Sequence, residues 1–357
     1  WQLACQCEGL SSTRARPFTR STFALAGKLP VAPKTFHHRL PMEDPKRPQR
    51  RRRRLPPEAA QSDFAARNPD GTRKVPGSRP RGKPPTDWGN VAEWYDDLVG
   101  DEGSEFHREV ILPGVLRMLA IHDGERVLDV ACGQGVLSRA LERKGAKVTG
   151  VDAARGLIEA PTQRSMPPAP VTPPKEGTTE GEAPQPSIDY RLLDVRTLSN
   201  VEEFKERFHA AACILAIQNM EPIRPVFEGI ASSLVSDGAG RVVIVLNHPV
   251  FRSPQYTSWG WDGTAVQYRR VDRYLLPRKH PIVTHPGKDP KRYTWSFHRP
   301  LGTYIKAMRQ AGLLVEAIEE WASHKHSDSG PRAKAENDAR KEIPLFMAIK
   351  GRKVPGI

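Results

Sequence analysis

Apolar positions divide the chain into a patterned part after residue 87 and two stretches that lack a regular pattern. Between residues 88 and 350, short apolar runs alternate with segments of helical periodicity. Runs without polar interruption predict strands buried on both faces, and their alternation with helices predicts a doubly wound, mostly parallel α/β sheet of seven strands. The predicted strands cover 126–130, 146–151, 190–193, 211–217, 241–246, 313–319 and 344–349, and the predicted helices cover 88–120, 136–144, 223–235 and 301–311.

The two patternless stretches are rich in proline. Residues 1–87 contain 13 prolines and residues 161–187 contain 8, which is too many for regular packed elements. We therefore predict a disordered tail over 1–87 and a domain over 88–350 that carries a disordered surface insertion at 161–187. Residues 351–357 are expected to form a short C-terminal tail.

Positive charge is concentrated in the tail. The chain carries a net charge of +14, of which residues 1–87 contribute +12 (19 Lys and Arg against 7 Asp and Glu). Because the remainder is nearly neutral, a broad nucleic-acid-binding face is not expected, and nucleic acid would bind only through the tail. Residues 1–41 resemble a transit peptide in composition. However, the first methionine is Met42, so we favour the interpretation that the native protein starts there and that residues 1–41 are translated from sequence upstream of the start codon. For residues 42–87 we predict a solvated basic arm. The alternative is that the Arg50–Arg54 run is a targeting signal or a patch that binds nucleic acid.

Several classes of protein are excluded. The longest apolar run, Ala210–Ile217, is too short to span a bilayer. The four cysteines do not form a disulfide framework or a zinc site, which indicates a reducing compartment, and we predict a cytoplasmic protein. The histidines at 323–326 have no further ligands at metal-binding spacing, so no metal is expected. The oligomeric state cannot be read from the sequence.

The motif that carries chemistry follows the first strand. In the sequence LDVACGQG, Gly133 and Gly135 permit a tight turn that a ligand can approach, and Asp152 ends the second strand, where a carboxylate can accept both ribose hydroxyls. An NAD-binding fold is the competing interpretation. However, its third glycine is replaced by Ser138, and Asp129 before the turn favours a cationic ligand over a pyrophosphate.

LDVACGQG followed by VTGVD resembles the first two motifs of class I S-adenosylmethionine (SAM)-dependent methyltransferases of the methyltransferase type 11 family. The downstream half, with NHPVFR, SWGWD, YRRVDRY, SFHRPL and GPRAKAE, resembles a bacterial branch of this family. The resemblance covers residues 88–350 apart from the insertion, and it implies a Rossmann-like fold with SAM as the cofactor. It further implies that Asp194 lies by the adenine, that the end of strand four lies by the methyl group, and that Tyr95 covers the cofactor. The candidate cofactor-binding residues are Asp129, Ala131, Cys132, Gly133, Gln134, Gly135, Asp152, Ala153, Asp194, Val195, Ile217, Gln218 and Tyr95.

A long connection after strand five, residues 247–297, holds nine of the 25 aromatic residues of the chain. Rigid aromatic side chains at the carboxyl edge of a sheet predict an aromatic-rich cap over a small-molecule pocket, and a satellite core is the alternative. Strand four is followed by Asn219-Met220-Glu221-Pro222 instead of the Asn/Asp-Pro-Pro-aromatic loop of amide and nucleobase N-methylases, which argues against an exocyclic nucleobase amine. The candidate substrate-binding residues are Asn247, Arg252, Trp259, Trp261, Arg269 and Arg270.

Methyl transfer needs a base only when the acceptor has a proton to lose. His248, directly after strand five, is the first candidate, and His298 is the second. The resulting prediction is a SAM-dependent methyltransferase that acts on a small molecule. The alternatives are an RNA or protein methyltransferase recruited through the basic arm, and a SAM-binding module without catalysis.

Overall fold

The computed structural model describes residues 88, 99–100, 102–164, 187–263, 265–285 and 289–354. The predicted tail over 1–87, the candidate Tyr95 and most of the predicted insertion lie outside these residues. Within the described ranges, no helix is long and apolar enough to cross a membrane.

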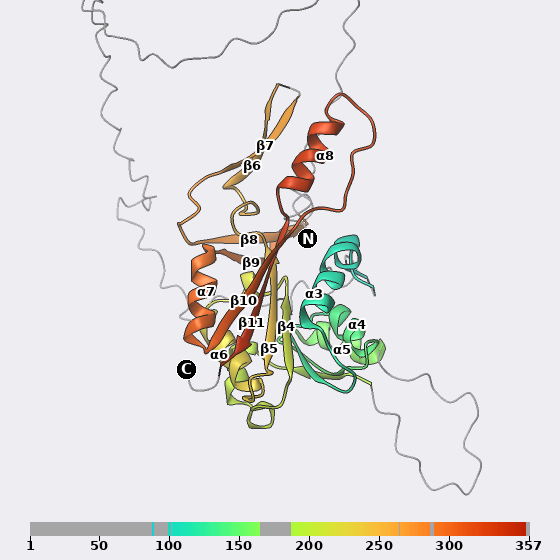
Figure 1. Ribbon diagram of the computed structural model, residues 1–357, viewed down its shortest axis with the longest axis vertical. Helices are drawn as coiled ribbons and strands as arrows, with labels where there is room; N and C mark the ends of the chain where they lie inside the picture. Colours follow the sequence, from blue (N-terminus) through green and yellow to red (C-terminus); the bar gives the residue numbers. More distant parts are fainter. Residues whose placement is uncertain are drawn as a thin grey trace, which may run out of the picture. The chain divides into compact units, whose positions relative to one another are not determined.

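A seven-stranded sheet organises the domain, as the sequence predicted. Its order is β10-β11-β5-β4-β1-β2-β3, and only β11 runs antiparallel to its two neighbours (Figure 1). The parallel neighbours pair in register, as in Val127 with Val148 and Val127 with Ala210. The strands are β1 (Arg126–Val130), β2 (Lys147–Asp152), β3 (Asp189–Leu192), β4 (Ala210–Ile214), β5 (Arg241–Asn247), β10 (Leu313–Trp321) and β11 (Phe346–Lys353).

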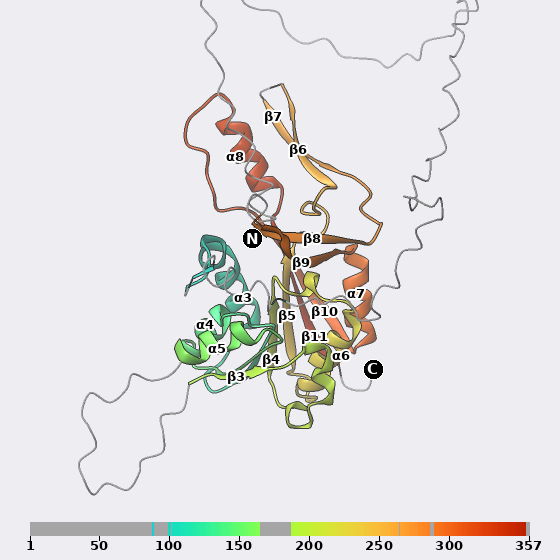
Figure 2. The same ribbon diagram turned by 180° about the vertical axis from the view of Figure 1, so that it is seen from behind.

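Helices cover both faces of the sheet, because its central strands are buried on both sides. Residues 242–246 of β5 are 1% exposed or less, and successive side chains enter opposite cores. The helices α3 and α4 pack on one face and α6 and α7 on the other (Figures 1 and 2). The helical elements are η2 (His107–Ile111), α3 (Leu112–Leu119), α4 (Val136–Glu142), α5 (Arg155–Arg164), η3 (Val195–Asn200), η4 (Glu202–Phe204), η5 (Ile217–Asn219), α6 (Arg224–Ser233), α7 (Leu301–Gln310) and α8 (Ala333–Glu342).

The connection after β5 forms two antiparallel hairpins that are separate from the main sheet. One pairs β6 (Thr257–Asp262) with β7 (Val266–Val271), and the other pairs β8 (Arg278–His285) with β9 (Asp289–His298). The aromatic side chains of this connection do not form a common cluster. They pair instead with cations: Trp259 with Arg269, Trp261 with Arg332, Trp295 with Lys279, and Tyr256 with Arg278.

The predicted aromatic-rich cap is therefore not confirmed. The physical reason is that a guanidinium or ammonium group packs favourably on an aromatic face, so these four rings are covered by cations and not by one another.

Candidate functional site

A tight turn joins β1 to α4 at the carboxyl edge of the sheet. Gly133 and Gly135 have φ angles of +55° and +78°, in the left-handed region that glycine adopts without strain. Ala131 shares this conformation at +57°, although it has a Cβ. The Cys132 amide donates to the Val151 carbonyl over 3.0 Å, which ties the turn to the neighbouring strand β2.

Asp152, the last residue of β2, holds the turn in place. Its Oδ2 accepts a hydrogen bond from the Gly133 amide at 3.0 Å, and its Oδ1 accepts one from the Ala154 amide at 2.8 Å. The carboxylate is buried, and burial raises its pKa while these backbone donors lower it. A carboxylate held in this way can still accept further hydrogen bonds through its remaining lone pairs.

Asp129 lies beneath the turn and does not reach the cavity wall. Its side chain is fully buried, and its Oδ2 accepts a hydrogen bond from the Ser138 hydroxyl at 2.6 Å. The pKa of Asp129 is raised to about 7, mainly by burial and in part by the nearby Asp152 carboxylate, against the Ser138 hydrogen bond, which lowers it. The position that distinguishes this motif from the dinucleotide fingerprint, Ser138, therefore serves as the partner of Asp129.

A cavity opens over this turn, between the ends of β1, β2, β4 and β5. Nine of the predicted site residues line it: Ala131, Cys132, Gly133, Gln134, Asp152, Ala153, Asp194, Val195 and Gln218, and Asn247 joins them from the predicted substrate-binding set. Gly135 and Ile217 are neighbours of lining residues and do not line the cavity themselves. The lining residues that the sequence analysis did not select include Trp88, His107, Leu157, Arg196, Met220 and Ile282.

Asp194 caps η3 and forms an ion pair in the cavity wall. It accepts a hydrogen bond from the Arg196 amide at 3.0 Å, and the Arg196 Nη2 lies 2.6 Å from its Oδ2. This bidentate contact raises the pKa of the Arg196 guanidinium. A planar guanidinium is thus fixed at the edge of the cavity, where the resemblance places the adenine.

Among the described residues that line the cavity, the side-chain atoms without a hydrogen-bond partner are all acceptors. The amide nitrogens of Gln218 and Asn219 donate to the Leu215 carbonyl at 2.8 Å and 3.4 Å, and that of Gln134 donates to the Gly100 carbonyl. Consequently the side-chain oxygens of these three residues, together with Asp129 Oδ1, have no hydrogen-bond partner within the described ranges. Such a site fits a ligand that carries amino and hydroxyl donors and a positive charge, which are the groups that SAM presents.

His107 enters the cavity from η2, a π-helical turn. Such turns distort a helix locally and often occur at functional sites. The ring is 4% exposed, and its Nδ1 lies 2.8 Å from the Ser104 hydroxyl. The pKa of His107 is lowered to about 4, mainly by burial and in part by the adjacent Arg108, so the imidazole is neutral at pH 7.

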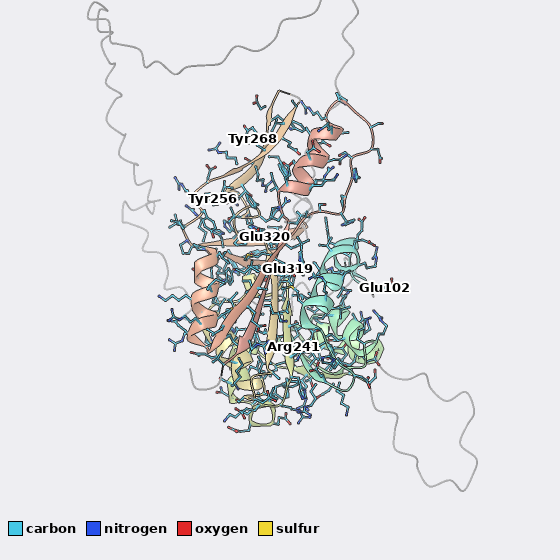
Figure 3. All side chains as sticks on the ribbon, in the orientation of Figure 1. Glu102, Arg241, Tyr256, Tyr268, Glu319 and Glu320 are labelled. Carbon is cyan, nitrogen blue, oxygen red and sulfur yellow. The ribbon has the colours of Figure 1, made fainter. Side chains whose placement is uncertain are left out.

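The two histidines predicted as bases lie away from the cavity lining. His248 Nε2 lies 2.7 Å from Glu320 Oε1 on β10, labelled in Figure 3, and its Nδ1 accepts a hydrogen bond from the Val250 amide at 3.3 Å. Burial lowers the pKa of His248, whereas Glu320 raises it. His298 Nε2 lies 2.7 Å from the Tyr274 carbonyl. His248 therefore holds the loop after β5 to β10, and His298 holds the loop before β8 to β9.

Five of the six residues predicted to bind substrate lie in the region of the first hairpin and do not line the cavity. Arg269 donates to the Phe251 carbonyl at 2.9 Å and to the Thr257 hydroxyl at 2.7 Å. Arg252 and Arg269 lie over the Trp259 ring, Trp261 lies under Arg332, and Arg270 pairs with Asp272 at the surface. In these contacts the side chains bind neighbouring residues of the hairpin, its flanking loop and Arg332. Among the described residues, no group of three or more His, Cys, Asp or Glu side chains is arranged to hold a metal ion.

The sheet order and the glycine turn beside an acidic strand end define a Rossmann-like cofactor-binding domain of the class I methyltransferase type. Residues 104–280 match the model of a family described as a methyltransferase domain. The matched segment, just under half of the chain, is therefore similar to a methyltransferase domain.

Similar proteins carry related names. The chain is 31% identical over 195 residues to a ubiquinone biosynthesis O-methyltransferase of Xylella fastidiosa, covering 55% of this chain and 63% of that protein. It is 33% identical over 102 residues to the protein of the same name in Paracidovorax citrulli, covering 29% and 36%. The chain thus spans less than two thirds of the length of these curated relatives. A SAM-dependent methyltransferase structure from Mesorhizobium loti superposes with a TM-score of 0.49 at 23% identity, covering 68% of this chain and 96% of that one.

Proposed function

We propose that this protein transfers a methyl group from SAM to a hydroxyl oxygen of a small molecule. The observation that carries the proposal is the cavity wall in which Asp152 fixes the Gly133 amide and the unpartnered atoms are acceptors. The oxygen acceptor is suggested by the names of the relatives, which are O-methyltransferases. The nearly neutral charge of residues 88–357 supports a small molecule as the methyl acceptor.

Each part of the cofactor has candidate partners in the cavity. Asp152 would accept the ribose hydroxyls, Gly133 and Gln134 would border the methionine part, and Asp194 would lie by the adenine. Gln218 at the end of β4 would lie by the methyl group. When bound, SAM would supply a methyl group attached to a positively charged sulfur. An oriented nucleophile would attack the methyl carbon in line and displace the sulfur as the leaving group.

His107 is the candidate base for the acceptor hydroxyl. When Nδ1–H donates to the Ser104 oxygen, Nε2 is the ring nitrogen that can take a proton. The acceptor loses its hydroxyl proton to Nε2 as its oxygen gains the methyl group, and the imidazolium later releases the proton to solvent. Because the ring is neutral at pH 7, it is ready to act without prior deprotonation.

The cofactor assignment is tested by calorimetric titration of the whole chain with S-adenosylhomocysteine. We expect a micromolar Kd, and no binding of NAD at the same concentrations, because Ser138 replaces the third glycine of the dinucleotide fingerprint. A folded protein that binds NAD and not S-adenosylhomocysteine would refute the proposal. Incubation with methyl-labelled SAM and a cell extract then identifies the acceptor.

Replacing His107 with glutamine is expected to lower kcat about 10²-fold or more while leaving S-adenosylhomocysteine affinity unchanged. The matched control is His248→Gln, which alters a histidine outside the cavity lining and should keep kcat within about threefold. If His248→Gln alone abolishes turnover, His248 is the base instead.

The pH profile provides a second test of the same base. The neutral form of His107 persists down to its pKa of about 4, so kcat/KM should stay level between pH 8 and pH 5.5. An inflection near pH 6.5 that survives in His107→Gln would contradict the assignment.

We further propose that the reaction takes place in the cytoplasm and that residues 1–87 are dispensable for it. The alternative that the sequence leaves open is a macromolecular acceptor recruited through the basic arm. Deletion of the arm would abolish turnover of an extract in that case, and would leave it intact with a small acceptor.

A further inference from the structure

The buried face of the β8–β9 hairpin is polar, which is unusual for a hairpin that rests on a domain. Cross-strand pairing puts Arg278 opposite His298, His280 opposite Ser296, and Ile282 opposite Thr294. Alternate residues of a strand share a face, so these three pairs form one surface. Five of its six side chains are polar.

This polar face points inward. The exposed fractions are 4% for His280, 1% for Thr294, 6% for Ser296 and 7% for His298. The aromatic Tyr293, in contrast, belongs to the opposite face and is 44% exposed. A hairpin that only covered a core would bury its apolar face, so the reversed pattern requires another cause.

The unpartnered atoms of this region are hydrogen-bond donors. Thr294 Oγ1, His280 Nε2 and Arg278 Nε have no hydrogen-bond partner in the described structure, and the same holds for Ser253 Oγ, whose residue is 4% exposed. Each of these atoms can donate a hydrogen bond, with the imidazole nitrogen doing so in one tautomer. The pattern is the opposite of the cofactor cavity, where the unpartnered atoms are acceptors.

Ser253 belongs to a loop that packs on the same face. Tyr256 of this loop, labelled in Figure 3, lies 5.8 Å from the His280 ring between centroids, and the Arg278 guanidinium carbon lies 4.0 Å from the Tyr256 ring centroid. The Tyr256 hydroxyl accepts a hydrogen bond from Arg278 Nη1 at 2.5 Å. The loop that carries Ser253 therefore packs, through Tyr256, against Arg278 and His280 of this face.

The polar face adjoins the cofactor cavity. Ile282, on the same face two residues from His280, lines that cavity. Arg299, directly after β9, donates through Nη2 to the Met220 carbonyl at 2.5 Å, and Met220 also lines the cavity. Arg299 Nη2 also lies 2.5 Å from Glu221 Oε2, so its charge is compensated there.

We propose that the buried face of the β8–β9 hairpin binds an oxyanion of the methyl acceptor, such as a carboxylate or a phosphate, through Arg278, His280, Thr294 and Ser253. The inference rests on the proposed function, and it assigns the substrate to anionic small molecules. A guanidinium with two hydroxyls and an imidazole is a donor set that matches such a group. Burial lowers the pKa of His280, and His298 and Arg278 contribute in the same direction. Since the donor atoms have almost no accessible surface, the hairpin has to move outward to admit the anion.

Inorganic phosphate is the first probe, added to the whole chain at constant ionic strength while the melting temperature is followed. We expect saturable stabilisation of the wild-type protein, and at least about tenfold weaker phosphate binding in Thr294→Val and Arg278→Gln. Without phosphate, Thr294→Val should melt at the same or a higher temperature, because valine removes an unsatisfied buried hydroxyl.

Matched controls are available for both variants. Arg270→Gln removes an exposed arginine that pairs with Asp272, and Thr162→Val removes a hydroxyl that already donates to the Ile158 carbonyl. Neither should change the phosphate affinity. If phosphate does not bind the wild-type protein, or if Thr294→Val destabilises the protein and leaves phosphate binding intact, the anion site is refuted.

The labelled products of the extract reaction separate an acceptor's own anionic group from free phosphate. Labelled product that is retained on an anion exchanger at pH 7, with a raised KM for it in Arg278→Gln, supports the proposal. Neutral product together with phosphate binding would mean that the site takes a free oxyanion, and would overturn the substrate assignment. Failure of the proposed function itself is recognised separately, as loss of S-adenosylhomocysteine binding in the wild-type protein.

Discussion

Replacing Asp152 with alanine is expected to weaken S-adenosylhomocysteine binding at least about 100-fold, because one carboxylate performs two tasks. It accepts hydrogen bonds from the amides of Gly133 and Ala154, which fixes the turn, and it is the proposed acceptor for the ribose hydroxyls. Hydrogen bonds to a charged group contribute about 1.5–3 kcal/mol each, so two lost contacts correspond to this factor or more. Calorimetric titration of the wild-type and variant chains measures the effect.

Two further variants make this result interpretable. Asp152→Asn keeps one acceptor oxygen and should retain part of the affinity. Asp189→Ala removes another aspartate, at the start of β3, which is half-exposed and pairs with Arg191. This variant should leave the affinity for S-adenosylhomocysteine unchanged. An Asp152→Ala protein that is folded and binds as tightly as the wild-type chain would show that the cofactor lies elsewhere.

Replacing Gly135 with alanine is expected to lower the free energy of unfolding by about 3 kcal/mol. The residue has a φ of +78°, where a Cβ costs about 1–2 kcal/mol. That Cβ would also lie 2.1 Å from the Tyr190 hydroxyl oxygen and 2.8 Å from its ring carbon Cζ, a contact that forces movement and costs about 1–3 kcal/mol. Urea denaturation followed by circular dichroism measures the loss.

The two contributions can be separated within this chain. Gly238 has a similar φ of +84° with no atom within 4 Å of a built Cβ, so Gly238→Ala should show the conformational cost alone, about 1–2 kcal/mol. Combining Gly135→Ala with Tyr190→Phe removes the hydroxyl and should recover part of the clash. Equal losses in Gly135→Ala and Gly238→Ala would contradict a close contact with Tyr190.

The sheet could be predicted from the sequence because most of its strands contain short, mostly apolar runs. Val127, Val148 and Val243 stand in such runs, and each predicted strand overlaps an observed one. The hairpins after β5 could not, because Trp259 and Trp261 indicate burial without indicating what covers them. Their partners Arg269 and Arg332 are 10 and 71 residues away, and local periodicity carries no information about such pairs.

The cofactor end of the site followed from the rule that ligands bind where parallel strands end. This rule selects Asp152, and the resemblance to methyltransferases adds Asp194 and Gln218; all three line one cavity. It does not select His107, which comes from the helical segment before β1. The only local signal for His107 is Ser104 three residues earlier, the spacing that brings its hydroxyl to the ring, and that spacing is common in helices.

Strand β11 occupies the position between β5 and β10 in the sheet, although it follows both in the chain. In the described sheet, β10 pairs with β11 alone, so β10 has no template until residues 346–353 have been synthesised. During translation, the edge of β5 that pairs with β11 stays unpaired until β11 is synthesised, about a hundred residues later. Both hairpins are synthesised in between. Completion of the sheet is therefore a late step in biosynthesis, and a lesion in β11 would release β10 as well as β11 from the finished domain.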